Sequence, residues 1–367
     1  MNSLVNRSLD RDRGREIEVT LSGKKGGEVM CLRKSYIVSI AAYLIISLSP
    51  LTSAQAAEQV LVAYGGHNET AAPMWVGIET GLFKKRGLDV SMLQLRSGPI
   101  LMATLASGSV QVVYSASSSA INAISAGMRI HCIAFPANRI ARQLMTRKEI
   151  KSLEELRGKV FGVQSIGGGF WLQTMLLLDH LNIDPDKYQL KLRVIGDTAT
   201  ITQALITGQV DAAVLPYSFS ERAKRAGFHS LADAGELKGA LQLTGLCAQR
   251  DFVLQSRDLA LRLIQGMVEA VVFIHDPKNK ANVMQVLKKN LRFDKLEETE
   301  MSYKVLRQVA TLEVDLNLEA WKTTQRIISR VNPKVGQADL NQLLDRSLVR
   351  SLEESGFLPE MRRRVGG

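Results

Sequence analysis

The chain has 367 residues, of which 46% are hydrophobic and 23% are charged, values typical of a globular protein and not of a disordered one. The length allows two domains of ordinary size. A formal net charge of +11 would suit binding to nucleic acid, but no basic stripe alternates with aromatic residues, so we expect no nucleic-acid partner.

The N-terminal part resembles a secretory signal. Arg33-Lys34 precede an uncharged apolar stretch, and Ala54-Gln55-Ala56 follow it as a small-x-small cleavage pattern. We expect residues 1–56 to be an N-terminal extension and signal peptide, with an uncleaved membrane anchor as the alternative. Residues 1–29 are polar and precede the signal, so Met30 is the expected start. This predicts export to the periplasm or another extracytoplasmic space.

From residue 60 onward, short apolar runs alternate with amphipathic segments. The expected strands cover residues 60–64, 88–95, 110–115, 129–135, 159–164, 190–195 and 210–216. The expected helices cover residues 73–83, 99–108, 118–127, 152–158, 170–181 and 200–208. This alternation is typical of βα units on a mostly parallel sheet.

An internal repeat indicates two similar lobes. "TLASGSVQVVYS", which begins at Thr104, matches "ALITGQVDAAVLP", which begins at Ala204, after a shift of 100 residues. A further strand is expected at 241–252. The remaining chain has helical periodicity at 256–275, 279–290, 295–310, 317–331 and 340–357.

These patterns predict an α/β protein. It has two similar lobes with mostly parallel sheets, joined by crossing hinge strands, and C-terminal helices. The expected lobe 1 covers residues 57–145 and 245–367, and the expected lobe 2 covers residues 146–244.

Loops rich in small polar residues follow the expected strands, at the edge where such sheets bind ligands. They cover residues 65–72, 96–99, 115–120, 165–171, 196–200 and 216–220. Several open a helix, where free backbone N–H groups favour an anionic or carbonyl group. Trp75, Phe170, Trp171 and Tyr217 lie on or beside them, which predicts a small-molecule cleft. The alternative is that each loop is only a capped helix start.

The loop residues also bear on the ligand. Arg96 is the only cationic side chain within the six loops, and we expect His67 to be neutral. A bare inorganic anion would then depend mostly on helix ends. We therefore expect an organic ligand with a planar or apolar part.

The sequence predicts no catalytic, metal or cofactor site. The histidines and cysteines lack zinc-ligand spacing. The loop at 162–174 narrowly fails the patterns of a P-loop, a nucleophile elbow and a dinucleotide fingerprint. Because glycine has no side chain, we expect Gly167–Gly169 to let a ligand approach the main chain closely. Cys132 and Cys247 lie in apolar strand-like runs, where we expect buried free thiols, with a disulfide as the alternative.

Four segments resemble a known family. They are "GIETGLFKKRGLDV" (77–90), "RSGPILMATLASGSVQVVYS" (96–115), "IKSLEELRGKVFGVQS" (150–165) and "ALITGQVDAAVLP" (204–216). They are similar to type II periplasmic solute-binding proteins of ABC importers, in the branch that carries nitrate, sulfonates, taurine or the thiamine pyrimidine precursor. The likeness runs from about residue 60 to about residue 276.

The resemblance implies a monomer that captures a small organic molecule and delivers it to an ABC permease with its ATPase. It places ligand contacts at Asn68, Glu69, Ser97, Gly98, Ser115, Ser117, Ser165, Gly168, Phe170, Trp171, Asp197, Thr198 and Tyr217. The chain departs from the family at two places. Gln111 stands where the family often has Asp, although the equivalent position of the repeat, Asp211, keeps it, and Ser118-Ser119 stand where Pro is usual. The alternative is an enzyme on the same fold acting on a small heterocycle. Its only nearby acid–base pair is His67 with Glu69, and the cysteine-rich motif of the related pyrimidine synthase is missing from the sequence.

Overall fold

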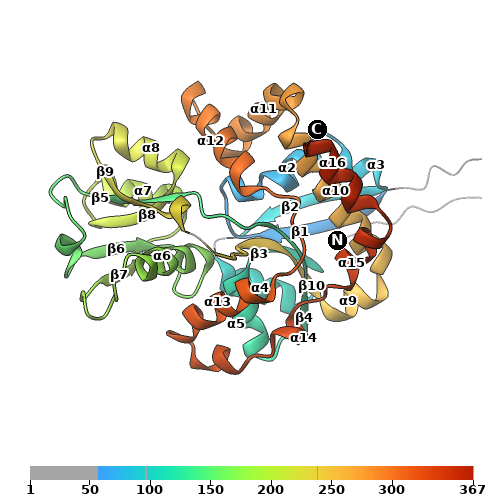
Figure 1. Cartoon of the computed structure of the whole chain (residues 1–367), viewed down its shortest axis with the longest axis horizontal. Coiled ribbons are helices and arrows are strands. Elements are labelled where there is room, and N and C mark those ends of the chain that lie inside the picture. Colours follow the sequence, from blue (N-terminus) through green and yellow to red (C-terminus); the bar gives the residue numbers. More distant parts are fainter. Residues whose placement is uncertain (1–56, 96, 238, 367) are drawn as a thin grey trace, which may run out of the picture. The chain divides into compact units, whose positions relative to one another are not determined.

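The computed structural model describes residues 57–95, 97–237 and 239–366, which lie within one compact unit, Gln55–Gly367 (Figure 1). The predicted signal peptide, the expected start at Met30 and the cationic Arg96 lie outside the described residues. Two five-stranded sheets with flanking helices form two lobes, followed by C-terminal helices, as predicted.

The first sheet has the strand order β2-β1-β3-β10-β4. Its strands are β1 (Glu58–Tyr64), β2 (Leu88–Gln94), β3 (Val112–Ala116), β4 (Ile130–Ala137) and β10 (Thr244–Gln249). β1 pairs in parallel with β2 and β3, whereas β10 lies antiparallel between β3 and β4. Four strands therefore point the same way and β10 runs against them.

The second sheet repeats this arrangement in the order β7-β6-β8-β5-β9. Its strands are β5 (Arg142–Thr146), β6 (Val160–Val163), β7 (Lys191–Val194), β8 (Ala212–Pro216) and β9 (His229–Asp233). β6 is parallel to β7 and β8, and β5 is antiparallel to β8 and β9. Both sheets are therefore mixed. Four strands of each sheet point the same way, as expected, but β10 in the first sheet and β5 in the second are antiparallel to both of their neighbours.

The predicted internal repeat is confirmed. α4 (Gly98–Ala106), β3 and α5 (Ser117–Ser125) recur 100 positions later as α7 (Thr198–Ile206), β8 and α8 (Tyr217–Arg225). Gly108 and Gly208 follow α4 and α7 with φ of 75° and 76°. A residue without a Cβ adopts this left-handed conformation without strain, so the two glycines end equivalent helices.

The chain crosses between the sheets twice. It leaves β4 to enter the second sheet as β5, and it leaves β9 to return to the first sheet as β10. The antiparallel strand of each sheet, β5 or β10, is thus the first strand that the chain forms after it crosses from the other sheet. The expected lobe boundary at residue 145 falls within β5, and the exact domain limits stay a prediction.

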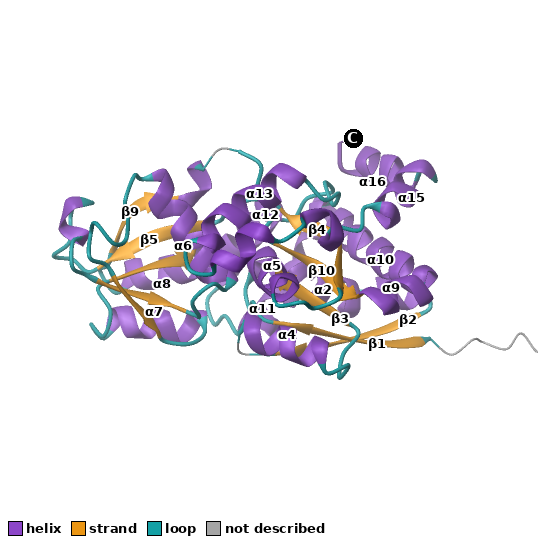
Figure 2. Ribbon diagram, turned by 90° about the horizontal axis from the view of Figure 1, so that it is seen from below, coloured by secondary structure: helices purple, strands orange, loops and turns teal. Residues whose placement is uncertain are grey.

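Helices cover both sheets (Figure 2). The first lobe also has α2 (Ala72–Glu79) and α3 (Leu82–Lys85), and the second has α6 (Gly169–His180). The helix expected at 152–158 is only a 3₁₀ turn at Glu154–Leu156. The C-terminal helices are α9 (Arg250–Gln255), α10 (Arg257–His275), α11 (Lys280–Leu291), α12 (Leu296–Val309), α13 (Leu318–Ser329), α14 (Leu340–Leu343), α15 (Ser347–Glu354) and α16 (Phe357–Gly366).

The expectation of free thiols was wrong, because Cys132 and Cys247 form a disulfide. Cys132 lies in β4 and Cys247 in β10, directly opposite each other in this antiparallel pair. The bond therefore joins the strand that leaves the first sheet to the strand that returns to it.

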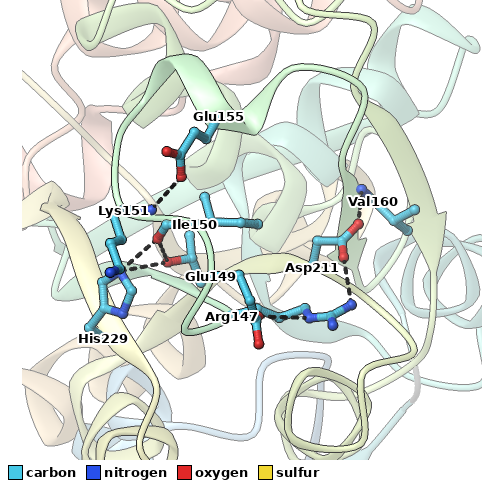
Figure 3. Close-up of polar contacts among 9 residues, drawn as sticks. Arg147, Glu149, Ile150, Lys151, Glu155, Val160, Asp211 and His229 are labelled. Atoms are coloured by element: carbon cyan, nitrogen blue, oxygen red, sulfur yellow. Dashed lines mark hydrogen bonds and ion pairs between the residues drawn. The ribbon is translucent and has the colours of Figure 1, made fainter.

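Asp211 is equivalent to Gln111 in the internal repeat, and it has a structural role in the second lobe (Figure 3). One oxygen of its carboxylate accepts from Arg147 Nη1 at 3.2 Å, and the other accepts from the Val160 N–H at 2.9 Å. The segment after β5 is fixed further where His229 Nε2 donates to the Ile150 carbonyl at 2.7 Å. These contacts join β5, β6, β8 and β9, so Asp211 stabilises the second sheet.

Candidate functional site

A cleft of about 470 Å³ lies between the two lobes. Its walls come from the carboxyl ends of β1, β2, β3, β6 and β7 and from the starts of β5 and β10. Because β5 and β10 are antiparallel to their neighbours, their starts lie at the same edge as the other strands' ends. Five of the six loops expected at this edge contribute to the lining, and the loop at 216–220 does not.

Arg142, the first residue of β5, is the arginine among the described residues that line this cleft. It is only 5% exposed and carries its guanidinium against the Phe170 ring, 4.6 Å from the ring centre. Nε donates to Gln173 Oε1 at 2.7 Å, and Nη1 donates to the Val214 carbonyl at 3.2 Å. Nη2, which is also a donor, has no hydrogen-bond partner among the described residues.

Arg142 remains protonated although it is buried. Burial lowers the pKa of the guanidinium to about 10, while the negative charge of Glu69 opposes this shift. Arg142 therefore stays positive at neutral pH. A buried, planar guanidinium favours binding of a carboxylate, a sulfonate or a similar oxyanion.

The first-lobe wall is held in place by His67. Its Nδ1 accepts from the Tyr64 hydroxyl at 2.9 Å, and its Nε2 donates to the Asn290 carbonyl at 2.8 Å. Burial lowers the pKa of this imidazole, in part offset by the Asn290 hydrogen bond. His67 is therefore neutral at pH 7, which agrees with its hydrogen-bond pattern. Next to it, Asn68 accepts from the Thr70 N–H at 3.0 Å and fixes the turn that follows β1.

The second-lobe wall begins with the three-glycine loop before α6. The Gly167 carbonyl accepts from Asn122 Nδ2 at 3.3 Å, which brings the loop against α5 of the first lobe. α6 then presents Phe170 and Gln173, spaced three residues apart on one helix face, to the cleft. At the start of α7, Asp197 caps the helix by accepting from the Thr200 N–H at 2.8 Å.

Part of the set of residues expected at the site lines the cleft. These residues are Asn68, Gly98, Ser115, Phe170, Asp197 and Thr198. The others do not line it: Glu69, Ser97, Ser117, Ser165, Gly168, Trp171 and Tyr217.

Several of these side chains point elsewhere for visible reasons. Ser117 Oγ donates to the Gln242 carbonyl at 2.7 Å, and Glu69 accepts from Ser302 Oγ at 3.1 Å. The Trp171 ring is 1% exposed and packs in the core, on a different face of α6 from Phe170. Tyr217 donates to Asp233 on the hinge side of the second sheet.

The acid–base pair that the alternative enzyme would need does not form. His67 is engaged by Tyr64 and Asn290, whereas Glu69 is engaged by Ser302. The carboxylate and the imidazole share no hydrogen bond in the described part of the chain. Within the same residues, no three His, Cys, Asp or Glu side chains gather as metal ligands would.

A family model described as "NMT1/THI5 like" matches residues 68–281, more than half of the chain. The chain belongs to the NMT1/THI5-like family. The match includes the cleft-lining residues of both sheets from Asn68 onward, and Gly65, Gly66 and His67 lie just before it.

One relative aligns over most of this chain, and solved structures share its fold. A Bacillus subtilis (strain 168) protein named "Putative binding protein YtlA" is 22% identical over 325 residues, covering 87% of this chain and 97% of the relative. A solved structure from Bordetella bronchiseptica RB50 has a TM-score of 0.70 at 18% identity, covering 82% of this chain and 98% of that one. The alkanesulfonate-binding protein SsuA from Xanthomonas axonopodis pv. citri, bound to MOPS, has a TM-score of 0.62 at 15% identity, covering 80% of this chain and 96% of that one. These structural likenesses show a common two-lobed fold.

No helix in the described part of the chain combines the length and apolar character needed to cross a bilayer.

Proposed function

We propose that this protein is the extracytoplasmic solute-binding component of an ABC importer, and that it captures a small organic anion between its lobes. Family membership, the two-lobed fold and the binding roles named for its relatives support the importer. The observation that carries the anion is Arg142, a buried cation that lines the cleft and whose Nη2 has no hydrogen-bond partner among the described residues.

The arrangement suits capture by closure. The anionic group binds Arg142, where Gln173 and Phe170 already hold the guanidinium, so little side-chain ordering is lost on binding. Leu95, Leu101 and Ile195 give the cleft an apolar part for the body of the ligand. Closure about the two crossing segments then brings both walls onto the ligand, and the closed form docks on the permease.

The proposal is tested with the mature protein and matched solute pairs. Native mass spectrometry of the protein as purified looks for a bound solute. Thermal shift then compares carboxylates and sulfonates with their uncharged amides. We expect an anion at 100 times its Kd to stabilise the fold by about 2.7 kcal/mol, and its amide to have no comparable effect. Stabilisation by neutral or cationic solutes alone would contradict the anion assignment, and no binding by any solute in the panel would contradict the importer role.

A further inference from the structure

The C-terminal helix α12 carries a buried carboxylate, that of Glu298, at its contact with the second lobe. α12 is anchored to the first lobe, where Ser302 donates to Glu69 at 3.1 Å and Tyr303 donates to the Ile274 carbonyl at 3.5 Å. At its other end, Glu298 forms an ion pair with Arg225 of α8 and lies 3.8 Å from Arg222 Nε of the same helix. α8 belongs to the second lobe, so these ion pairs cross from one lobe to the other.

The buried apolar side chains of α12 and α8 belong to different clusters. Tyr303 and Leu306 of α12 pack in the first-lobe core, whereas Phe219 and Ala223 of α8 pack in a separate second-lobe cluster. The described residues contain no buried apolar cluster shared by the two helices. The Glu298 side chain is 7% exposed, while those of Arg222 and Arg225 are 41% and 38% exposed. If the lobes separate, the Glu298 carboxylate becomes hydrated and its ion pairs are lost.

The neighbouring helix α13 makes a different kind of contact. It packs on α6 of the second lobe, and its Ile327 and Ile328 share one apolar cluster with Met175 and Leu176 of α6. Arg326 and Arg330 also pair with Asp179 at 3.0 and 2.6 Å, with all three side chains at least 30% exposed. α13 begins beside the crossing segment, since Trp321 Nε1 donates to Gln242 Oε1 at 2.8 Å. An apolar contact next to a hinge suits a pivot that stays together as the lobes open.

We propose that Glu298, with Arg222 and Arg225, is an interlobe latch that sets the balance between the open and closed lobes. α13 is the pivot and α12 carries the latch. A carboxylate that is buried and paired only in the closed form shifts the population towards that form, because a group can bias an equilibrium only by differing between its two states. The latch thereby tunes the affinity of the cleft without touching the ligand. Only this effect on affinity rests on the proposed solute-binding function.

The test measures the distance between the lobes of the ligand-free protein. Spin labels are placed at Ile100 and Val194, which are 46% and 56% exposed and adjoin the cleft-lining Leu101 and Ile195 on opposite lobes. Cys31 is replaced by serine, and the disulfide between Cys132 and Cys247 stays unlabelled. Electron–electron double resonance then reports the populations with short and long distances.

Glu298→Gln keeps the shape of the side chain and removes its charge. We expect the ratio of closed to open molecules to fall by about tenfold, less than for a fully buried ion pair because both arginines are partly exposed. Glu300→Gln is the matched control, because Glu300 lies on the same helix but pairs with Lys280 at 3.0 Å within the first lobe. It should leave the distances unchanged. Asp179→Asn should change them by less than Glu298→Gln does, since its pairs are exposed and lie at the pivot.

Unchanged distances in Glu298→Gln, or an equal shift in Glu300→Gln, would overturn the latch. If Glu298→Gln does not fold, Arg222→Gln with Arg225→Gln gives the same test from the exposed side of the pair. We expect that double variant to open further than the wild type, because it leaves the closed form with an unpaired carboxylate, and an unshifted distribution would reject the latch. Failure to find a ligand would contradict the proposed function and leave this distance result decisive for the latch.

Discussion

At the residue scale, Arg142 accounts for the chemistry that we propose for the cleft. Arg142→Lys keeps the positive charge but loses the planar fork that reaches Gln173, Val214 and the ligand together. Arg142→Gln loses the charge as well. For the anion that gives the largest thermal shift, we expect affinity to fall by about tenfold in the lysine variant and by about a hundredfold in the glutamine variant.

Isothermal titration calorimetry measures both affinities, with Arg139→Gln as the control. Arg139 lies three residues away on the crossing segment and is exposed. Its charge contributes only a weak, screened attraction. An equal loss in Arg139→Gln would show that general electrostatics, and not the fork of Arg142, holds the anion.

Arg142 also shows what the sequence could not reveal about the site. The candidate residues were sought in loops that follow parallel strands, and Arg142 opens an antiparallel strand instead. The available signal was weak: Arg142 directly precedes the short stretch "QLMT", and a charge at the start of a buried strand needs a partner or a function. Ser115 and Ser117 show the opposite limit. Both lie in an expected loop, but only Ser115 lines the cleft, since the direction of a side chain depends on where the strand turns into the helix.

At the scale of elements, the glycine loop at 167–169 is a contact between lobes. A Cβ at Gly169 would lie 2.6 Å from the Cβ of Ala116, at the end of β3 in the first lobe. The near-matches to nucleotide motifs reflect a strand–glycine–helix turn that lets two backbones approach closely. The sequence predicted the close approach but assigned it to a ligand, since nothing in the sequence showed that Ala116 faces this loop.

Gly169→Ala should therefore hold the lobes slightly apart. We expect about a tenfold loss of affinity for the same anion, the usual scale of overpacking at a tight contact, with little change in melting temperature because the lobes can separate to relieve the clash. Gly366→Ala is the control, because an added Cβ there meets nothing within 4 Å. Wild-type affinity in Gly169→Ala would mean that the closed form leaves room at this position.

The strands and the repeat were predictable because their signals are local, whereas the disulfide was not. Cys132 and Cys247 are 115 residues apart, and they meet only because β10 returns between β3 and β4. The pattern of apolar runs predicts that a strand exists at β10 but not which strands it will pair with. Periodicity within each segment therefore predicted the two lobes. The positions of the cysteines and of Arg142 depend instead on which strands β10 and β5 pair with after the chain crosses between the sheets.

At the scale of the whole molecule, His67 links the cleft to the C-terminal helices. Its Nε2 donates to the carbonyl of Asn290 in α11, so protonation would replace the accepting nitrogen at the Tyr64 hydroxyl by a second donor. Burial lowers the pKa of His67 below the ordinary 6.5. Between these two pKa values the unfolded chain binds a proton that the folded chain does not, so stability falls as the pH drops through 6.5.

We expect His67→Gln to lose less stability than the wild type between pH 7.5 and pH 5 in urea unfolding. The difference is at most about 1.4 kcal/mol per pH unit, the value for one proton. Measurement above pH 5 avoids a second effect. The His131 ring, 3.4 Å from the Asp345 carboxylate, lowers the pKa of that carboxyl, and the stability from it is lost only as the pH falls below its ordinary 3.8. His180→Gln is the control, since that side chain is exposed. Identical pH profiles for His67→Gln and the wild type would mean that His67 accepts a proton in the folded protein as readily as in the unfolded chain, and that its contact with α11 does not depend on the neutral ring.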